Sequence, residues 1–308
     1  MKRKHLNLLL AAVALGLVAA VYFSQEKPEP PPSPLTTLNS GDINRILIQH
    51  AGKPDIRLDK RKAEWWLVAP VETRAESVEV AAILDLATRP SQRRYPVSEM
   101  DLAALGLAEP DWKVQLNDVR IEFGATDPIE ARRYVRLSGT VHLVEDPPSA
   151  ALDADYNDLV ARRLLPANAR ISRLQLPGLA LTRTDKDGWT VMPKAADKGA
   201  DAAQQLVGAW LNAQAMWITP LDRKRPTQGS IVIEIGDESF HFGILDRKDQ
   251  LVLARPELGV QLTLSKTLDS DLFELKPPPK EEPKAVSKPD PHPNPLPLGQ
   301  GGRAQRGG

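Results

Sequence analysis

Two short acidic stretches are the residues whose types and spacing most suggest chemistry. Residues 152–155 read Leu-Asp-Ala-Asp and residues 268–271 read Leu-Asp-Ser-Asp, so each contains an Asp-x-Asp pair. Such paired carboxylates can hold a divalent cation, but a metal site needs further ligands nearby, and no His or Glu stands at a suitable spacing. At a helix start, Asp and Ser accept hydrogen bonds from free backbone N–H groups, and a negative charge favours the positive end of the helix dipole. We therefore expect both stretches to begin a short closing helix, and we predict no metal site.

Other candidates for chemistry are scattered along the chain. No nucleophile-elbow or phosphate-loop motif is present, and the absence of cysteine excludes thiolate catalysis. Several tryptophans are candidates for stacking on a glycan, but aromatic residues at strand and helix positions are more often core residues. The residues considered were His5, His50, His142, His241 and His292, with Trp65, Trp66, Trp189, Trp210 and Trp217. We predict no catalytic, cofactor-binding or metal-binding residue and no cofactor, so the chain is not expected to be an enzyme.

The charge balance argues against a nucleic-acid partner. Lys and Arg total 40, and Asp and Glu also total 40, so the formal net charge is zero. A chain without net positive charge lacks the general electrostatic attraction to phosphate backbones. We predict no nucleic-acid role.

The N-terminus, residues 1–23, is predicted to be a membrane anchor. Three basic residues at 2–4 precede an uncharged run, Leu6 to Phe23, whose 18 residues would span ~27 Å as a helix, close to the apolar thickness of a bilayer. The positive-inside rule keeps the N-terminus cytoplasmic, which places the bulk of the chain outside a bacterial inner membrane, in the periplasm. A cleaved signal peptide is the alternative, because Val18 and Ala20 suit a cleavage site. The length of the apolar run favours the uncleaved anchor.

Proline-rich segments flank the part expected to fold. Residues 24–41 include the stretch EKPEPPPSPL and are predicted to be an extended spacer, whereas residues 277–308 show no apolar periodicity and are predicted to be a disordered tail. The folded region therefore comprises residues 42–276.

An internal repeat divides that region into two modules, residues 42–166 and 167–276. The stretch INRILI at 43–48 matches ISRLQL at 171–176, and WLVAP at 66–70 matches WTVMP at 189–193, pairing Trp66 with Trp189. The hairpin stretches ending in Phe-Gly at 124 and 243 follow in the same order, and the two acidic stretches come last. Four blocks in one order indicate a duplicated unit.

Each copy has the same pattern of predicted elements. Alternating apolar residues indicate antiparallel strands, with turns at Asn117-Asp118 and Gly236-Asp237. Apolar residues at helical spacing around 80–87 and 203–210 indicate one helix per copy, with Thr73-x-x-Glu76 and Asp201-x-x-Gln204 as capping boxes. The predicted class is α+β, with two tandem similar modules, each a mainly antiparallel sheet with one or two helices, following the transmembrane helix.

Several of these residues resemble a known family. The stretch LAALGLAEP at 102–110, the preceding Trp-x-x-x-Pro block, and the later RRYVRL and VHLV strands are similar to the bacterial family called domain of unknown function 4340, DUF4340. The second copy departs from the pattern, because it has no Gly-Leu-x-x-Pro block between Trp217 and Ser230. The resemblance implies an anchored or exported protein that associates with an envelope complex, such as an auxiliary component of ABC-type transport.

We therefore expect a membrane-anchored extracytoplasmic protein that acts as a non-enzymatic binding or assembly component with a protein partner. The doubled sheets would offer edges, or a groove between the modules, to that partner. The alternative is a cell-wall glycan-binding module or hydrolase, which would need a cleft containing two close carboxylates.

Overall fold

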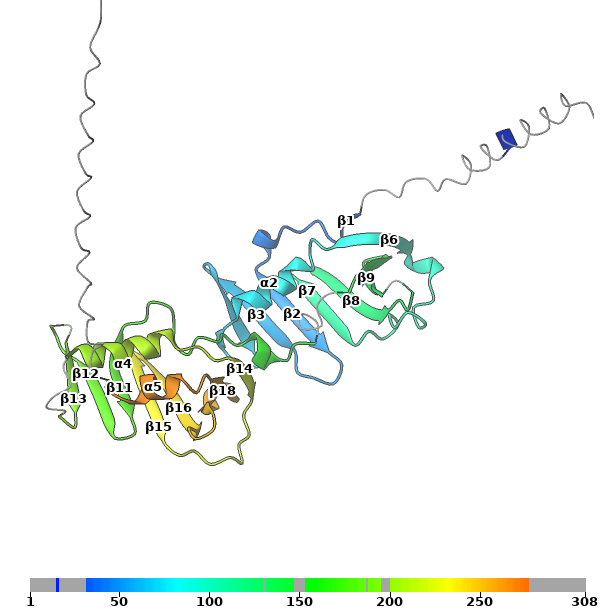
Figure 1. The fold of residues 1–308 in the computed structure, drawn as a ribbon. Helices are drawn as coiled ribbons and strands as arrows, with labels where there is room; N and C mark the ends of the chain where they lie inside the picture. The colour runs from blue at the N-terminus through cyan, green and yellow to red at the C-terminus, as the bar shows by residue number, and fades with distance from the viewer. Residues whose placement is uncertain are drawn as a thin grey trace, which may run out of the picture.

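The computed structural model describes residues 15–16, 32–129, 131–146, 153–186, 188–194 and 200–276. These residues form two modules side by side, each built on one antiparallel sheet with few helices (Figure 1). The α+β class with two sheet modules is therefore confirmed. The predicted anchor, apart from Leu15 and Gly16, residues 24–31 of the predicted spacer and the whole predicted tail lie outside the described residues, as do the positions of His5 and His292.

The first module contains a 10-stranded sheet in the order β1-β6-β10-β9-β8-β7-β2-β3-β4-β5. Its strands are β1 (Ser33–Pro34), β2 (Arg45–His50), β3 (Ile56–Arg61), β4 (Glu64–Ala69), β5 (Thr73–Arg74), β6 (Pro90–Pro96), β7 (Trp112–Leu116), β8 (Val119–Thr126), β9 (Arg132–Leu137) and β10 (Thr140–Glu145). Helix α2 (Ser77–Asp85) and the 3-10 turns η1 (Ser40–Asp42), η2 (Val97–Glu99) and η3 (Tyr156–Leu159) complete it.

The second module contains an 8-stranded sheet in the order β13-β12-β11-β15-β16-β17-β18-β14. Its strands are β11 (Ile171–Leu176), β12 (Leu179–Arg183), β13 (Trp189–Met192), β14 (Trp217–Pro220), β15 (Ser230–Ile235), β16 (Glu238–Asp246), β17 (Leu251–Arg255) and β18 (Val260–Leu264). Its helices are α4 (Ala200–Asn212), the 3-10 turn η4 (Pro256–Leu258) and α5 (Leu268–Phe273).

The two sheets share one strand order. Read from β14, the second sheet runs β14-β18-β17-β16-β15-β11-β12-β13, which places its strands in the positions of β6-β10-β9-β8-β7-β2-β3-β4 in the first. The helices also occur at equivalent places along the chain. Helix α2 follows β4 and the short β5 in the first module, and α4 follows β13 in the second. The predicted turns also agree, since Asn117 and Gly236 both adopt positive φ.

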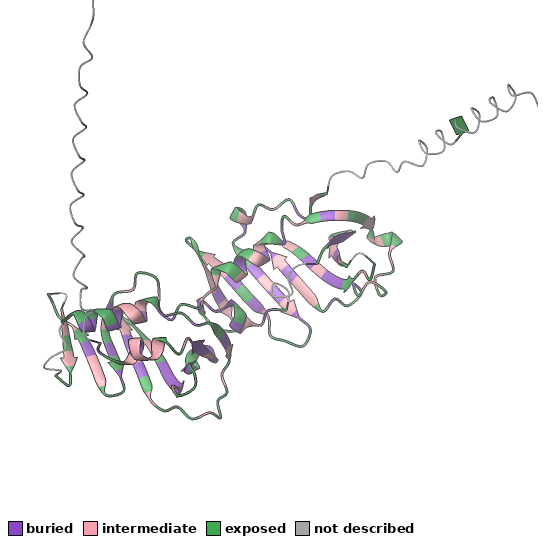
Figure 2. Ribbon diagram, in the orientation of Figure 1, coloured by how far each residue is buried: buried purple, intermediate pink, exposed green. Residues whose placement is uncertain are grey.

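Each sheet buries one face under its helix (Figure 2), and buried residues alternate with more exposed ones in strands such as β2 and β7. In the second module Leu206, Val207 and Trp210 of α4 are buried, and the Trp210 indole donates a hydrogen bond of 2.8 Å to the carbonyl oxygen of Leu272 in α5. Removal of this apolar surface from water is the main stabilising term for both modules.

A β-bulge in β4 corrects the predicted alignment of the two tryptophan blocks. Arg57 pairs with Ala69 and Leu58 with Leu67, which leaves Val68 as the extra residue. One extra residue reverses which side chains face the core. Leu67 is therefore fully buried, and Trp65, not Trp66, takes the core-facing place that Trp189 has in β13. Both X-Pro bonds of these blocks, Ala69-Pro70 and Met192-Pro193, are cis.

Two further details differ from the sequence prediction. Leu35 and Thr36 are buried, and Thr36 donates a hydrogen bond of 2.8 Å to the carbonyl oxygen of Ala87, so the first module begins before residue 42. Neither predicted capping box forms: Thr73 lies in β5 and α2 begins after Glu76, while Asp201 lies inside α4. The Glu76 carboxylate instead accepts a hydrogen bond from the backbone N–H of Arg162, which lies in the segment that leads to the second module.

The Leu-Gly-Leu block at 105–107 covers the outer face of the first sheet at Gly124. The backbone N–H of Ala125 donates a hydrogen bond of 2.8 Å to the carbonyl oxygen of Leu105, and a Cβ on Gly124 would lie 2.8 Å from Cγ of Leu107. Packing of the Leu-Gly-Leu block at this place therefore requires a glycine at position 124.

The second module fills the equivalent place with a different loop. Although it lacks the Leu-Gly-Leu block, the chain at 227–229 packs on Gly243, where a Cβ would lie 2.7 Å from Cγ2 of Thr227. The N–H of Ile244 donates to the carbonyl oxygen of Gly229 at 2.9 Å, as that of Ala125 does to Leu105. The loop is thus changed in sequence but kept in position.

Within the described residues, no helix is long and apolar enough to cross a bilayer. The predicted anchor, Leu6 to Phe23, lies outside those residues apart from Leu15 and Gly16.

Candidate binding pocket between the modules

The segment that joins the modules, residues 153–165 and here called the connector, is bound to the first module by its backbone. Val160 forms an antiparallel bridge with Ala75, next to the edge strand β5. The N–H of Glu76 donates to the carbonyl oxygen of Leu159, and the N–H of Ala161 donates to that of Arg74. The connector therefore extends one edge of the first sheet.

The connector is also bound to the edge of the second sheet. Arg163 bridges Gln214, just before the edge strand β14, and the Asn157 amide donates a hydrogen bond of 3.1 Å to the carbonyl oxygen of Ile218 in that strand. Leu159 and Leu164 are buried in a hydrophobic core that is continuous between the modules. The connector thus covers two sheet edges that would otherwise be open, and fixes the modules to each other.

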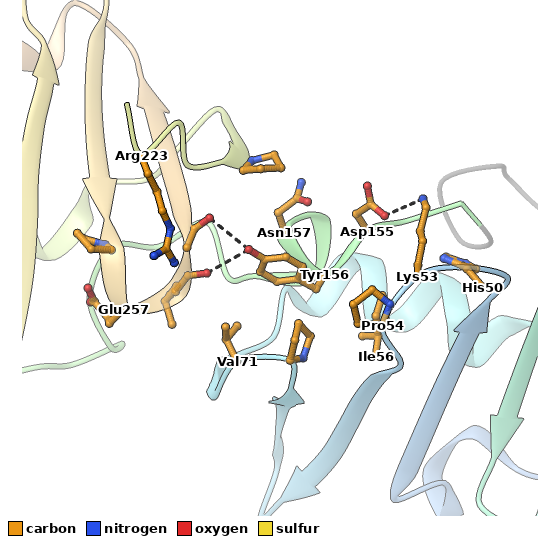
Figure 3. Close-up of a pocket in the computed structure, with 15 residues that line it drawn as sticks. His50, Lys53, Pro54, Ile56, Val71, Asp155, Tyr156, Asn157, Arg223 and Glu257 are labelled. Atoms are coloured by element: carbon orange, nitrogen blue, oxygen red, sulfur yellow. Dashed lines mark hydrogen bonds and ion pairs between the residues drawn. The ribbon is translucent and has the colours of Figure 1, made fainter. Parts of the chain in front are cut away.

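A pocket of about 530 Å³ lies at this junction. Its walls come from both modules and the connector (Figure 3). The lining residues are His50, Lys53, Pro54, Ile56, Pro70, Val71, Asp155, Tyr156, Asn157, Pro220, Arg223, Pro256, Glu257, Leu258 and Gly259. The volume falls within the ~300–1,000 Å³ that is usual for ligand sites, and rigid prolines make such a site pre-formed.

Tyr156 lies at the centre of the pocket and holds the second module. Its single phenol O–H donates a bifurcated hydrogen bond to the carbonyl oxygens of Leu258, at 3.3 Å, and Gly259, at 3.2 Å (Figure 3). Gly259 adopts φ +64°, and a Cβ there would lie 3.1 Å from the phenol oxygen, so a glycine is required for this close approach.

The acidic stretch 152–155 contributes to one side of this pocket. Asp155 accepts a hydrogen bond of 2.8 Å from Nζ of Lys53, and this bond raises the pKa of Lys53, with Asp153 and Asp158 adding to the effect. At the start of η3, the backbone N–H of Asp155 donates a hydrogen bond of 2.9 Å to Oδ2 of Asp158. The predicted structural role at a helix start is therefore confirmed, and Asp155 also joins the connector to the first module.

The second acidic stretch is remote from the pocket. Asp269 lies in the first turn of α5, paired with Arg247 at 2.6 Å and Lys266 at 3.1 Å. Burial raises the pKa of Asp269, but the hydrogen bonds from Arg247 and Lys266 outweigh burial and lower it. The two stretches therefore share a position at a helix start but contact different partners.

The opposite side of the pocket carries Arg223 and Glu257, which lie across Tyr156 from Lys53 (Figure 3). The carboxylate of Glu257 is paired with Arg255 at 2.8 Å. Arg223 is exposed and has no ion pair within the described residues. The pocket thus offers one unneutralised cation.

Asn157 contributes an unusual acceptor. Its side chain is 6% exposed, its amide nitrogen donates to Ile218 and Asp158, and its Oδ1 is buried without a partner among the described residues. A buried acceptor without a donor is costly to stability.

The other residues considered from the sequence are not brought together. Trp210 is a core residue, Trp65 and Trp189 pack against the core, and Trp66 lies on the outer face under Arg61. Trp217 is 47% exposed at the start of β14. These positions do not form one stacking surface.

The histidines are likewise separate. His50 lines the pocket and His241 is exposed on β16. His142 is buried, and its Nδ1 lies 2.9 Å from the Ser91 hydroxyl. Burial lowers the pKa of His142 to about 4, and the nearby charge of Arg94 adds to this effect. In the described part of the chain, no group of three or more His, Asp or Glu side chains is placed to hold a metal ion.

The pocket was not predictable from sequence motifs. Its residues come from the ends of β2, β4, β14 and β17 and from the connector, and only the connector makes them neighbours. The prolines just beyond the strand ends were the available signal, because a proline there marks a rigid turn.

Together, the fold and the pocket define a two-module, mainly antiparallel β protein with a ligand-sized site at the module junction. Residues 65–216 match the sequence model of a family described as Domain of unknown function (DUF4340), which supports the family resemblance from β4 to the residue before β14. That single match crosses the module boundary and does not divide the chain into two family copies. No curated protein and no solved structure matches the chain.

Proposed function

We propose that this protein is a membrane-anchored, extracytoplasmic binding component that holds a partner protein of the cell envelope in the pocket between its two modules. The observation that supports this most is the pocket itself, whose walls come from two modules fixed by one connector. A concave site that combines apolar walls with several polar side chains is the usual form of a ligand site.

The membrane anchor is the part of the proposal that rests on sequence alone. The run Leu6 to Phe23 would tether the chain to the inner membrane of a bacterium, and the proline-rich spacer would set its distance from the bilayer. We also propose that the two modules descend from one duplicated unit, because their strand orders coincide.

A glycan hydrolase is less well supported by the same site. Hydrolysis requires two carboxylates, one of which stays protonated near neutral pH. The carboxylates lining this pocket, Asp155 and Glu257, are each held in an ion pair, with Lys53 and Arg255, and they lie on opposite sides of Tyr156.

Photocrosslinking in intact cells tests the proposed function. A photoreactive amino acid would replace Val71, which lines the pocket, and Lys248, an exposed loop residue outside the lining, would carry the same group as a control. We expect one envelope protein to be enriched from position 71 and absent from position 248, as read by mass spectrometry. Identical products from both positions, or cell-wall fragments alone, would contradict the proposal.

The anchor is tested by fractionation. The full chain should stay in the membrane pellet after alkaline carbonate extraction, whereas a chain lacking residues 1–23 should be released. Release of the full chain would show that the N-terminal segment does not tether it.

A further inference from the structure

We propose that the pocket between the modules takes an extended, acidic peptide segment of the partner, whose carboxylate binds Arg223. This inference rests on the proposed function and adds the chemistry of the ligand. It follows from the cationic side chains and the apolar wall of the pocket.

The lysine and arginine side chains that line the pocket are Lys53 and Arg223. Four lining residues, Pro54, Pro70, Pro220 and Pro256, have no backbone N–H. Lys53 is engaged by Asp155 at 2.8 Å. The guanidinium of Arg223 therefore remains as the donor group without an acidic partner in the described chain, and its preferred ligand is a carboxylate or a phosphate.

The apolar wall favours side chains beside the acidic one. Ile56, Val71 and Leu258 line the pocket along with the prolines. Glu257 also lies near Arg223, but its carboxylate is neutralised by Arg255 at 2.8 Å, so it repels an incoming carboxylate less. The ligand should therefore combine apolar residues with Asp or Glu.

Selection from a display library of random short peptides tests this inference on the full chain in detergent micelles. We expect wild-type protein to enrich peptides that carry Asp or Glu beside apolar residues. The variant Arg223→Glu should lose that preference and bind the selected peptides about tenfold more weakly or worse, since the charge-assisted hydrogen bond becomes a repulsion. The matched reversal Lys248→Glu, in a loop outside the pocket lining, should leave their affinity within about twofold because the charge is screened at a distance.

The outcomes separate this inference from the proposed function. Peptides enriched without acidic residues, or with affinity unaffected by Arg223→Glu, would overturn the acidic ligand but leave a peptide-binding pocket. If no peptide is enriched, both are overturned; binding of inorganic phosphate or anionic vesicles that requires Arg223 would then identify an anion site instead.

Discussion

Tyr156 of the connector donates its phenol hydrogen bond to the carbonyl oxygen of Leu258 in the second module, at 3.3 Å. The preceding residue, Asp155, binds Lys53 of the first module at 2.8 Å. Two consecutive side chains thus contact opposite modules, and the pocket forms between the surfaces that they hold together.

The phenol of Tyr156 should contribute measurably to stability. Tyr156→Phe removes the hydrogen bond that the phenol shares between Leu258 and Gly259 while keeping the ring, so we expect the free energy of unfolding to fall by about 1 kcal/mol. Urea denaturation followed by tryptophan fluorescence measures the change. Tyr95→Phe is the control, because the Tyr95 hydroxyl has no hydrogen bond among the described residues, and an equal loss there would contradict the assigned role.

The contact of Gly124 with the Leu-Gly-Leu block predicts a graded glycine series. A Cβ at Gly124 meets the backbone carbonyl of Leu105, which cannot rotate away, so Gly124→Ala should destabilise the protein by about 2 kcal/mol or more. Gly243→Ala should cost less, because it meets the methyl group of Thr227. Gly139→Ala, with no atom within 4 Å, should change little. A thermal or urea series in which Gly124→Ala resembles Gly139→Ala would show that the block does not pack as described.

Helix α4 offers a stabilising change. Gly208 lies in its interior, and a Cβ there meets no atom within 4 Å. Alanine has a higher helix propensity, so Gly208→Ala should raise the free energy of unfolding by about 0.5 to 1 kcal/mol. A loss of stability in the same urea titration would indicate that a Cβ at position 208 clashes with a neighbouring part of the chain.

The buried His142 predicts a pH dependence of stability. Its pKa is about 4 in the folded protein against 6.5 for an exposed histidine, so the unfolded chain binds more protons between these pH values. Its contribution is complete above pH ~6.5 and should fall by about 2 to 3 kcal/mol on going to pH ~4.5. The variant His142→Asn should show a smaller fall between the same two pH values; an identical fall would assign the effect to the carboxylates.

The sequence predicts local features well because they depend on local residues. Asn117 and Gly236 tolerate positive φ, so their turns were predictable, as was the helix that buries Val80 and Ile83. The start of η3 at Asp155 was also predictable, because Asp is favoured at the first position of a helix.

Features that depend on pairing across the sheet were not predictable. The bulge at Val68 is set by how β3 pairs with β4, and it exchanges the places of Trp65 and Trp66 relative to the core. The pocket brings His50 beside residues more than a hundred positions later, and no local pattern indicates that approach. The position of Arg223 in the pocket lining likewise could not be predicted, because it depends on residues that are distant in the sequence.

Hydrogen exchange of the full chain, with and without the partner recovered by crosslinking, tests the central claim most directly. We predict new protection in the pocket segments 50–56, 70–71, 155–157 and 256–259, because the ligand would cover them. Protection confined to the outer sheet edges, at β1 with β6 and at β13, would show instead that the partner adds to a sheet edge, and would contradict a binding site between the modules.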